Sequence, residues 1–184
     1  MHKLFLLFSL VATITIHAQS KPSYTAGIEA GILKGGSDKS NAILFTNGIR
    51  YKNVMVGLGG GIDNYLFRSV PLFLSVRKGF GSRAVQPFVG ASAGINFSHP
   101  TNDQKQFYSA YDSAHFKNGF IADASAGIAI KIYKQLHIFI SAGYSYKTEK
   151  VIYKNDYFMI NIPRDNRTDI YRMNRWYFST GLWF

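Results

Sequence analysis

Apolar side chains alternate with small or polar ones in eight separate segments of the chain. Side chains of a β-strand point alternately to opposite faces, so each segment predicts a strand with one apolar and one polar face. In the last segment, Trp176, Phe178, Leu182 and Phe184 share a face that only Thr180 dilutes. The predicted strands cover residues 24–32, 42–51, 54–63, 70–77, 85–97, 120–132, 136–146 and 176–184.

The connections between these segments alternate in length, which predicts their arrangement. Tight connections occur at 51–53, 78–83 and 133–135, whereas those at 33–40, 64–68, 98–118 and 147–174 are mostly longer. Transmembrane barrels have short periplasmic turns and longer external loops. The sequence therefore predicts an all-β fold, a closed eight-stranded antiparallel up-and-down transmembrane β-barrel, with both termini in the periplasm.

A soluble barrel would show the same alternation with its apolar face turned inward. Here the polar face consists largely of Gly, Ser, Ala and Thr, which suit a narrow lumen better than a water-facing exterior. Aromatic residues of the apolar face gather near strand ends, as in the girdles at membrane interfaces. One predicted girdle contains Tyr24, Tyr51 and Phe184, and the other contains Phe45, Phe97, Phe120, Tyr144, Tyr146 and Trp176.

The first residues predict an export signal. Lys3 precedes an apolar run from Leu4 to Ile16, and Ala18 supplies a small residue at the expected cleavage site. This run of 13 residues is too short to cross a bilayer as a helix. The sequence thus predicts a signal peptide at 1–18 and one barrel domain at 19–184. The chain contains no cysteine, which excludes disulfides and thiolate metal sites.

Charged residues are few on the predicted strands and fall on the polar face. They form an expected lumen network of Glu29, Arg50, Asp63, Arg77, Asp123, Lys131 and Arg175. A charge in a narrow interior is costly unless it is paired, so we expect ion pairs that fill the lumen, with Glu29 or Asp123 paired to Arg175 or another inward cation. A narrow polar conduit is the alternative. The net charge of +11 is spread over turns and loops without a basic stripe, so no nucleic acid is expected.

The export signal, the eight alternating segments and the ending from Tyr177 to Phe184 resemble the small eight-stranded outer-membrane barrels of the OmpA-transmembrane and OmpX type, a porin-like group with an outer membrane protein β-barrel domain. The resemblance implies the outer membrane of a Gram-negative bacterium, with lipid and lipopolysaccharide as surroundings. It also implies that the barrel-assembly machinery recognises the C-terminal strand.

Specific function is expected in the two long external loops, 98–118 and 147–174. Parts of the second loop alternate and carry basic and aromatic residues, which predicts that the last two strands continue above the membrane as a hairpin. A surface-interaction or membrane-integrity role without catalysis is favoured, with an unknown extracellular ligand. A small-solute channel and a lipid-modifying enzyme are the alternatives, but the spacing of His99, His115 and His137 establishes no catalytic group, and neither a metal nor a cofactor is expected.

Overall fold

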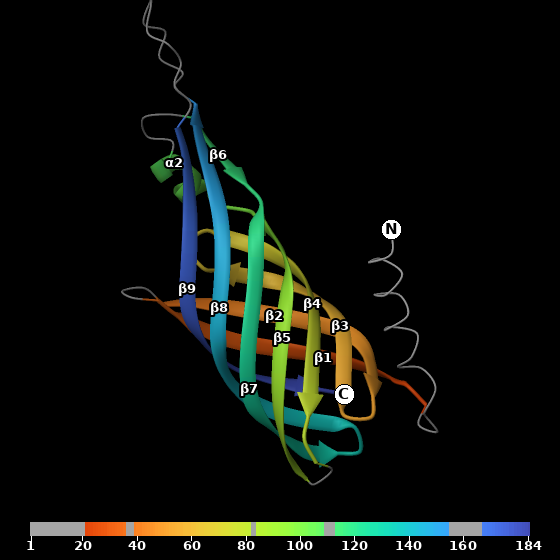
Figure 1. Cartoon of the computed structure of the whole chain (residues 1–184). Helices are drawn as coiled ribbons and strands as arrows, with labels where there is room; N and C mark the ends of the chain where they lie inside the picture. Colours follow the sequence, from red (N-terminus) through yellow and green to blue (C-terminus); the bar gives the residue numbers. More distant parts are fainter. Residues whose placement is uncertain (1–20, 36–38, 82–83, 109–112, 155–166) are drawn as a thin grey trace, which may run out of the picture.

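The computed structural model describes residues 21–35, 39–81, 84–108, 113–154 and 167–184. The predicted signal peptide lies outside the described residues and stays a prediction. Eight long strands follow one another around a barrel, and each pairs antiparallel with its neighbours (Figure 1). They are β1 (Ser23–Lys34), β2 (Lys39–Tyr51), β3 (Val54–Asn64), β4 (Arg68–Gly79), β5 (Val85–Ser98), β7 (Gly119–Tyr133), β8 (Leu136–Lys154) and β9 (Arg167–Trp183).

The barrel closes where β1 meets β9. Their register runs from Gly27↔Trp183 to Lys34↔Trp176. Beyond the Gly27↔Trp183 pair, Ala26 N donates to Phe184 O at 2.9 Å and Phe184 N donates to Ala26 O at 3.0 Å. This pairing leaves no open edge in the barrel, as a sheet in lipid requires. The predicted fold class is confirmed.

The apolar face of the strands lies on the outside of the barrel. Leu58 is 64% exposed and Ile140 is 64% exposed, whereas Ser75, Ser141 and similar small residues on the alternate positions are buried in the lumen. A continuous exposed apolar surface of this kind marks contact with lipid or a partner. The predicted orientation of the two faces is therefore confirmed. No helix among the described residues is long and apolar enough to cross a bilayer.

One end of the barrel, here called the short-turn end, carries the β2–β3, β4–β5 and β7–β8 connections, which the sequence predicts to be tight. At the opposite end the β3–β4 connection, residues 65–67, is equally short, although a longer one is expected there. The β2–β3 and β7–β8 turns each begin with a lysine in the left-handed region, Lys52 at φ 53° and Lys134 at φ 39°. Each lysine ammonium also lies over the ring of the preceding tyrosine, Tyr51 or Tyr133. The two turns are thus alike in backbone and in side-chain chemistry.

The opposite end, here called the loop end, has more regular structure than the sequence predicts. Residues 98–118, expected as a loop, include helix α2 (Asn102–Tyr108) and strand β6 (Ser113–Lys117). The helix starts with reciprocal caps, because Gln104 N donates to Thr101 Oγ1 and Thr101 N donates to Gln104 Oε1 at 3.0 Å. The expected external connection between β5 and β7 therefore contains regular structure.

A three-stranded sheet continues past the barrel at the loop end (Figure 1). Strands β8 and β9 stay paired up to Tyr153↔Arg167, which confirms the predicted hairpin. Strand β6 pairs with the other side of β8, from Ser113↔Lys154 to Lys117↔Lys150. We call this part, formed by β6, 148–154 and 167–173, the extension.

Most residues of the predicted aromatic girdles lie on the exposed outer face. Tyr144 and Trp176 pack edge to face near the loop end, with 5.5 Å between their ring centroids. Phe45 differs, because it lies at the middle of β2 and pairs with Ile28, itself at the middle of β1. It is thus displaced from the loop-end girdle towards the centre of the wall. Tyr24, Tyr51, Phe97, Phe120 and Phe184 keep strand-end positions, where Tyr51 is half-buried and the others are exposed. Tyr146 is half-buried and lies in the middle of the longer strand β8, where it pairs with Ala122 near the start of β7.

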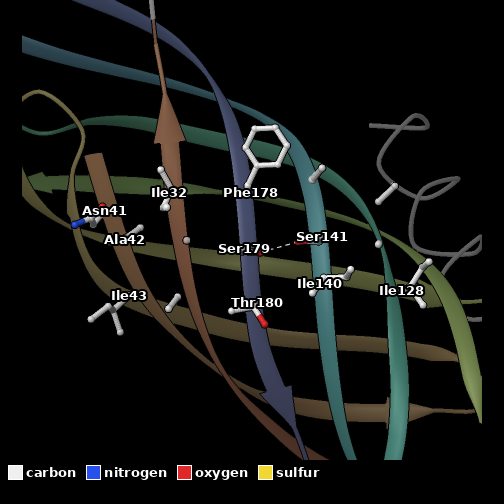
Figure 2. A pocket seen from close by; sticks show the side chains of 15 residues that line it. Ile32, Asn41, Ala42, Ile43, Ile128, Ile140, Ser141, Phe178, Ser179 and Thr180 are labelled. Atoms are coloured by element: carbon white, nitrogen blue, oxygen red, sulfur yellow. Dashed lines mark hydrogen bonds between the residues drawn. The ribbon is translucent and has the colours of Figure 1, made fainter. Parts of the chain in front are cut away.

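The outer wall also carries a shallow hollow of about 810 Å³ across the strands from β7 to β2 (Figure 2). Its lining includes the small residues Ala30 and Ala142 and the larger side chains of Ile32, Ile43 and Phe178. All of these side chains belong to the lipid-facing surface, and the lining is almost wholly apolar. A hollow of this kind suits acyl chains of the bilayer.

Candidate functional site: the filled lumen

A central ion pair crosses the lumen between β1 and β4. Arg77 donates to Glu29 Oε2, while the other carboxylate oxygen accepts hydrogen bonds from Tyr177 and, at 2.6 Å, from Ser179. Charge-assisted hydrogen bonds of this type are stronger than neutral ones. Glu29 is buried, and both of its carboxylate oxygens accept hydrogen bonds. This ion pair and its hydrogen bonds therefore join β1, β4 and β9 across the lumen and leave the charge of Glu29 paired.

Glycine provides the room that this arrangement needs. A Cβ added to Gly31 would lie 2.3 Å from the ring of Tyr177, which crosses the lumen at that point. At Gly127, an added Cβ would similarly come within 2.6 Å of the ring of Phe88. Aromatic side chains thus lie flat over glycines of neighbouring strands, and the lumen is packed with rings.

Below the ion pair, towards the short-turn end, three aromatic rings form a floor. Trp183 stacks on Phe139 at 4.6 Å between centroids and meets Phe88 edge to face at 4.8 Å. The Arg77 guanidinium lies 5.2 Å from the centroids of both Phe139 and Trp183. A guanidinium over aromatic faces adds a cation–π attraction to the packing. The floor therefore ties the ion pair to an apolar plug.

Above the ion pair, towards the loop end, lies a second charged group, here called the loop-end cluster. Lys147 is fully buried, and its ammonium lies 2.6 Å from Asp63 Oδ1 and 3.1 Å from Glu149 Oε1. Asn96 donates to Glu149 at 2.8 Å, and Ser69 donates to Asp63. A buried charge without such partners costs several kcal/mol, so these ion pairs and hydrogen bonds are what keep the three ionic groups inside. Glu149 Oε2 is buried and has no hydrogen-bond partner among the described residues.

Tyr65 connects the loop-end cluster to Arg175. Its hydroxyl donates to Ser145 O at 2.9 Å, and its ring lies between the cations of Lys147 (5.1 Å) and Arg175 (4.6 Å). Arg175 in turn donates to Ser40 Oγ at 2.8 Å. The short β3–β4 connection thus turns an aromatic side chain into the lumen between two cations.

An aromatic cap closes the loop end. Phe67 is fully buried and meets Tyr108, Phe116 and Tyr171 edge to face, at centroid distances of 4.8, 5.0 and 5.7 Å. Burial raises the pKa of the Tyr108 hydroxyl, so it stays neutral at physiological pH. Elements α2, β6 and β9 each contribute one ring to the cap, which therefore joins them to the β3–β4 connection.

The predicted network residues are distributed through this filled lumen. Glu29 is brought to Arg77 rather than to Arg175, and Asp123 accepts from Ser92 at 2.8 Å. Arg50 donates a weak hydrogen bond to Met55 Sδ at 3.4 Å and forms no ion pair among the described residues. Lys131 is exposed at the short-turn end, outside the groups described above.

Four important residues were not expected in the lumen. Lys147 and Glu149 were assigned to an external loop, yet they continue the inward positions of β8 set by Ser141, Gly143 and Ser145. Tyr65 and Phe67 belong to a tight reversal, where side chains are normally solvated. The sequence carries a signal for each pair. The alternation of β8 continues through Lys147 and Glu149, and Tyr65 and Phe67 are two aromatic residues in a single turn.

The space left in the lumen is small. Two internal cavities measure about 20 Å³ and 30 Å³, and a third of about 60 Å³ lies at the short-turn end. The first is bordered by Thr25 Oγ1 and Trp183 Nε1, two buried polar atoms without a partner among the described residues. Such a cavity has the volume and the polar groups to hold one water molecule.

Comparison with known proteins shows the fold. No protein-family model and no curated protein matches the sequence. The structure is similar to Neisserial surface protein A, with 13% identity over 89% of this chain and 98% of that chain and a TM-score of 0.57. It is also similar to the outer membrane protein OprG of Pseudomonas aeruginosa, with 10% identity over 89% and 95% and a TM-score of 0.57. The outer membrane protein AlkL, solved in DMPC bilayers, shares 12% identity over 92% and 94% with a TM-score of 0.52. The chain therefore has the fold of a small outer-membrane β-barrel.

Proposed function

We propose that this protein is an integral outer-membrane barrel with an occluded lumen, both termini in the periplasm, and a non-enzymatic role at the cell surface. The single observation that supports this best is the contrast between interior and extension. The lumen is filled by paired charges and aromatic rings, whereas the extension presents an exposed basic face. A membrane-integrity role through lipopolysaccharide follows from the chemistry of that face.

The basic face is formed by side chains on the outer side of the extension. Lys117 on β6 lies directly opposite Lys150 on β8, and Arg172 lies on β9 beside them, opposite Thr148. All three cations are exposed, and none takes part in an ion pair among the described residues. Like charges directly opposite on one sheet face are destabilising, so an external anion would stabilise this pair.

The position of the face relative to the membrane indicates which anion this is. The outer side of the extension continues the lipid-facing side of β8 and β9, just beyond the exposed rings of Tyr144 and Trp176. Lys34 and Lys39 add exposed cations at the neighbouring end of β1 and β2. Aromatic rings favour the headgroup level, and cations beyond them meet headgroup phosphates. Lipopolysaccharide phosphates of the outer leaflet therefore match this surface.

A binding titration with lipopolysaccharide tests the proposal. We expect the double variant K117Q/K150Q to lose about 10- to 30-fold in affinity, since each basic residue near a charged membrane contributes about 1 kcal/mol. The matched control K131Q/K134Q removes two exposed lysines at the short-turn end and should bind like the wild type. Equal losses in both variants would mean that net charge alone governs binding and would refute the assignment.

A narrow conduit for small solutes is the second candidate, supported by the small polar cavities along the lumen. Planar-bilayer recording separates the two functions, because an occluded barrel should give no steady conductance whereas a conduit should. The absence of catalysis is likewise part of the proposal. Mass spectrometry of lipid A from cells with and without the protein checks it, and a changed acyl pattern would favour a lipid-modifying enzyme.

A further inference from the structure

The mouth of the barrel at the short-turn end contains a cavity of about 60 Å³ with unusual charge. Three cations line it, Arg50, Lys52 and Arg77, together with the side-chain amides of Asn53 and Gln86. Neither Asp nor Glu is among its lining residues. Phe88 and Trp183 of the aromatic floor also line this cavity, and most of its other lining residues lie on or beside the tight turns of the short-turn end.

Arg50 is the key residue of this cavity because it has no carboxylate partner among the described residues. It is half-buried, and its recorded hydrogen bond goes to the weak acceptor Met55 Sδ at 3.4 Å. The sequence offers no acid nearby, since the three tight connections and their flanks (50–55, 77–86 and 131–137) contain neither Asp nor Glu. Arg77 and Arg175, by contrast, are held by Glu29 and by Ser40 with Tyr65.

One further cation lies at the mouth of this cavity, on the β2–β3 turn. Lys52 occupies the left-handed region, which costs a residue with a side chain about 1 to 2 kcal/mol. A lysine kept in a position better suited to glycine places an additional cation at the cavity mouth.

We propose that this cavity binds an oxyanion, a phosphate or carboxylate group, that enters from the short-turn side. The Arg50 guanidinium presents a planar fork suited to two oxygens of one such group, and Lys52 adds a point charge at the entrance. The volume accommodates a single anionic group rather than a whole solute. The group belongs either to a phospholipid headgroup of the adjoining leaflet or to a soluble anion. This site is independent of the loop-end role proposed above.

The two tryptophans of the chain make a direct test possible. In a Trp176→Phe background Trp183 is the sole tryptophan, and it lines the cavity. The refolded full chain in detergent is titrated with inorganic phosphate while Trp183 emission and binding heat are recorded. We expect saturable binding, and we expect R50Q to weaken it at least 10-fold while R50K restores part of the affinity. Far-UV ellipticity of each variant establishes that the barrel is intact.

Lys52 and Lys134 provide a matched pair, because both begin a two-residue turn with positive φ and lie over the preceding tyrosine. Only Lys52 lines the cavity. We expect K52Q to weaken phosphate binding several-fold and K134Q to leave it unchanged. Equal effects of K52Q and K134Q, or no saturable binding of phosphate or lipid by intact protein, would overturn the proposal.

A lipid-binding experiment in nanodiscs distinguishes a phospholipid headgroup from a soluble anion as the source of the bound group. Retention of phosphatidylglycerol over phosphatidylcholine by the wild type but not by R50Q would identify a lipid headgroup. Phosphate binding without this lipid preference would identify a soluble anion. Either result supports the site, whereas a lipid preference that R50Q keeps counts against it.

Discussion

The two halves of the lumen handle charge in opposite ways. Towards the loop end, Lys147 is enclosed by Asp63 and Glu149 beneath the aromatic cap. At the short-turn mouth, Arg50 and Lys52 face a cavity without any acid. The difference follows from access to water, since a charge sealed under aromatic rings needs a partner in the chain, whereas a charge at an open mouth is solvated. Paired charges therefore support the fold, and unpaired ones stay available to a ligand.

Removal of the buried lysine should produce the largest effect on stability. In K147M, Asp63 and Glu149 would remain buried without a cation, so we expect the free energy of unfolding to fall by about 3 to 5 kcal/mol. Urea unfolding of the protein in lipid vesicles measures it. K150M, which changes an exposed lysine of the same strand, should stay within about 0.5 kcal/mol of the wild type. Similar losses in both variants would show that Lys147 is not specially placed.

Loss of the central carboxylate should have an intermediate effect. E29Q removes the charge that Arg77 and Tyr177 share, and hydrogen bonds to charged groups contribute about 1.5 to 3 kcal/mol. We expect about 2 kcal/mol of destabilisation, and a smaller loss for D123N, whose carboxylate accepts from Ser92 but has no cation partner among the described residues. A double-mutant cycle of E29Q with R77Q measures the pair directly, and additive effects would contradict the ion pair.

Substitution of Arg50 at the short-turn mouth should have the smallest effect on the free energy of unfolding. We expect R50Q to change the free energy of unfolding by no more than about 0.5 kcal/mol, since no carboxylate loses its partner. The same urea titration measures this change. A loss of several kcal/mol would mean that Arg50 supports the barrel, and the contrast between the two halves would then disappear.

The strands themselves are predictable because an alternating pattern has a single physical cause, a wall between two environments. The pattern fails where the two environments become alike. Residues 147–150 place charged or polar side chains on both faces of β8, Lys147 and Glu149 inward and Lys150 outward, so polarity alone does not show which of them face the lumen. Its inward charges were missed for the same reason.

The partners of charged residues are less predictable than their face. Glu29 and Arg77 lie on strands that are not adjacent, and their meeting depends on how the barrel brings them across the lumen. The burial of Tyr65 and Phe67 depends on how the loop end of the barrel is closed, and no local sequence pattern predicts that closure. Helix α2 is different, because the capping residues Thr101 and Gln104 are visible in the sequence.

The seam between β1 and β9 has a consequence for how the molecule assembles. These strands stand at opposite ends of the sequence, so their pairing is the most non-local contact in the barrel and among the slowest to form. The long β8–β9 ribbon joins neighbours along the chain and forms earlier. Until β1 pairs with β9, one edge of β9 carries unpaired backbone N–H and C=O groups. At this stage a helper protein or an aggregating copy of the chain competes with β1 for that edge.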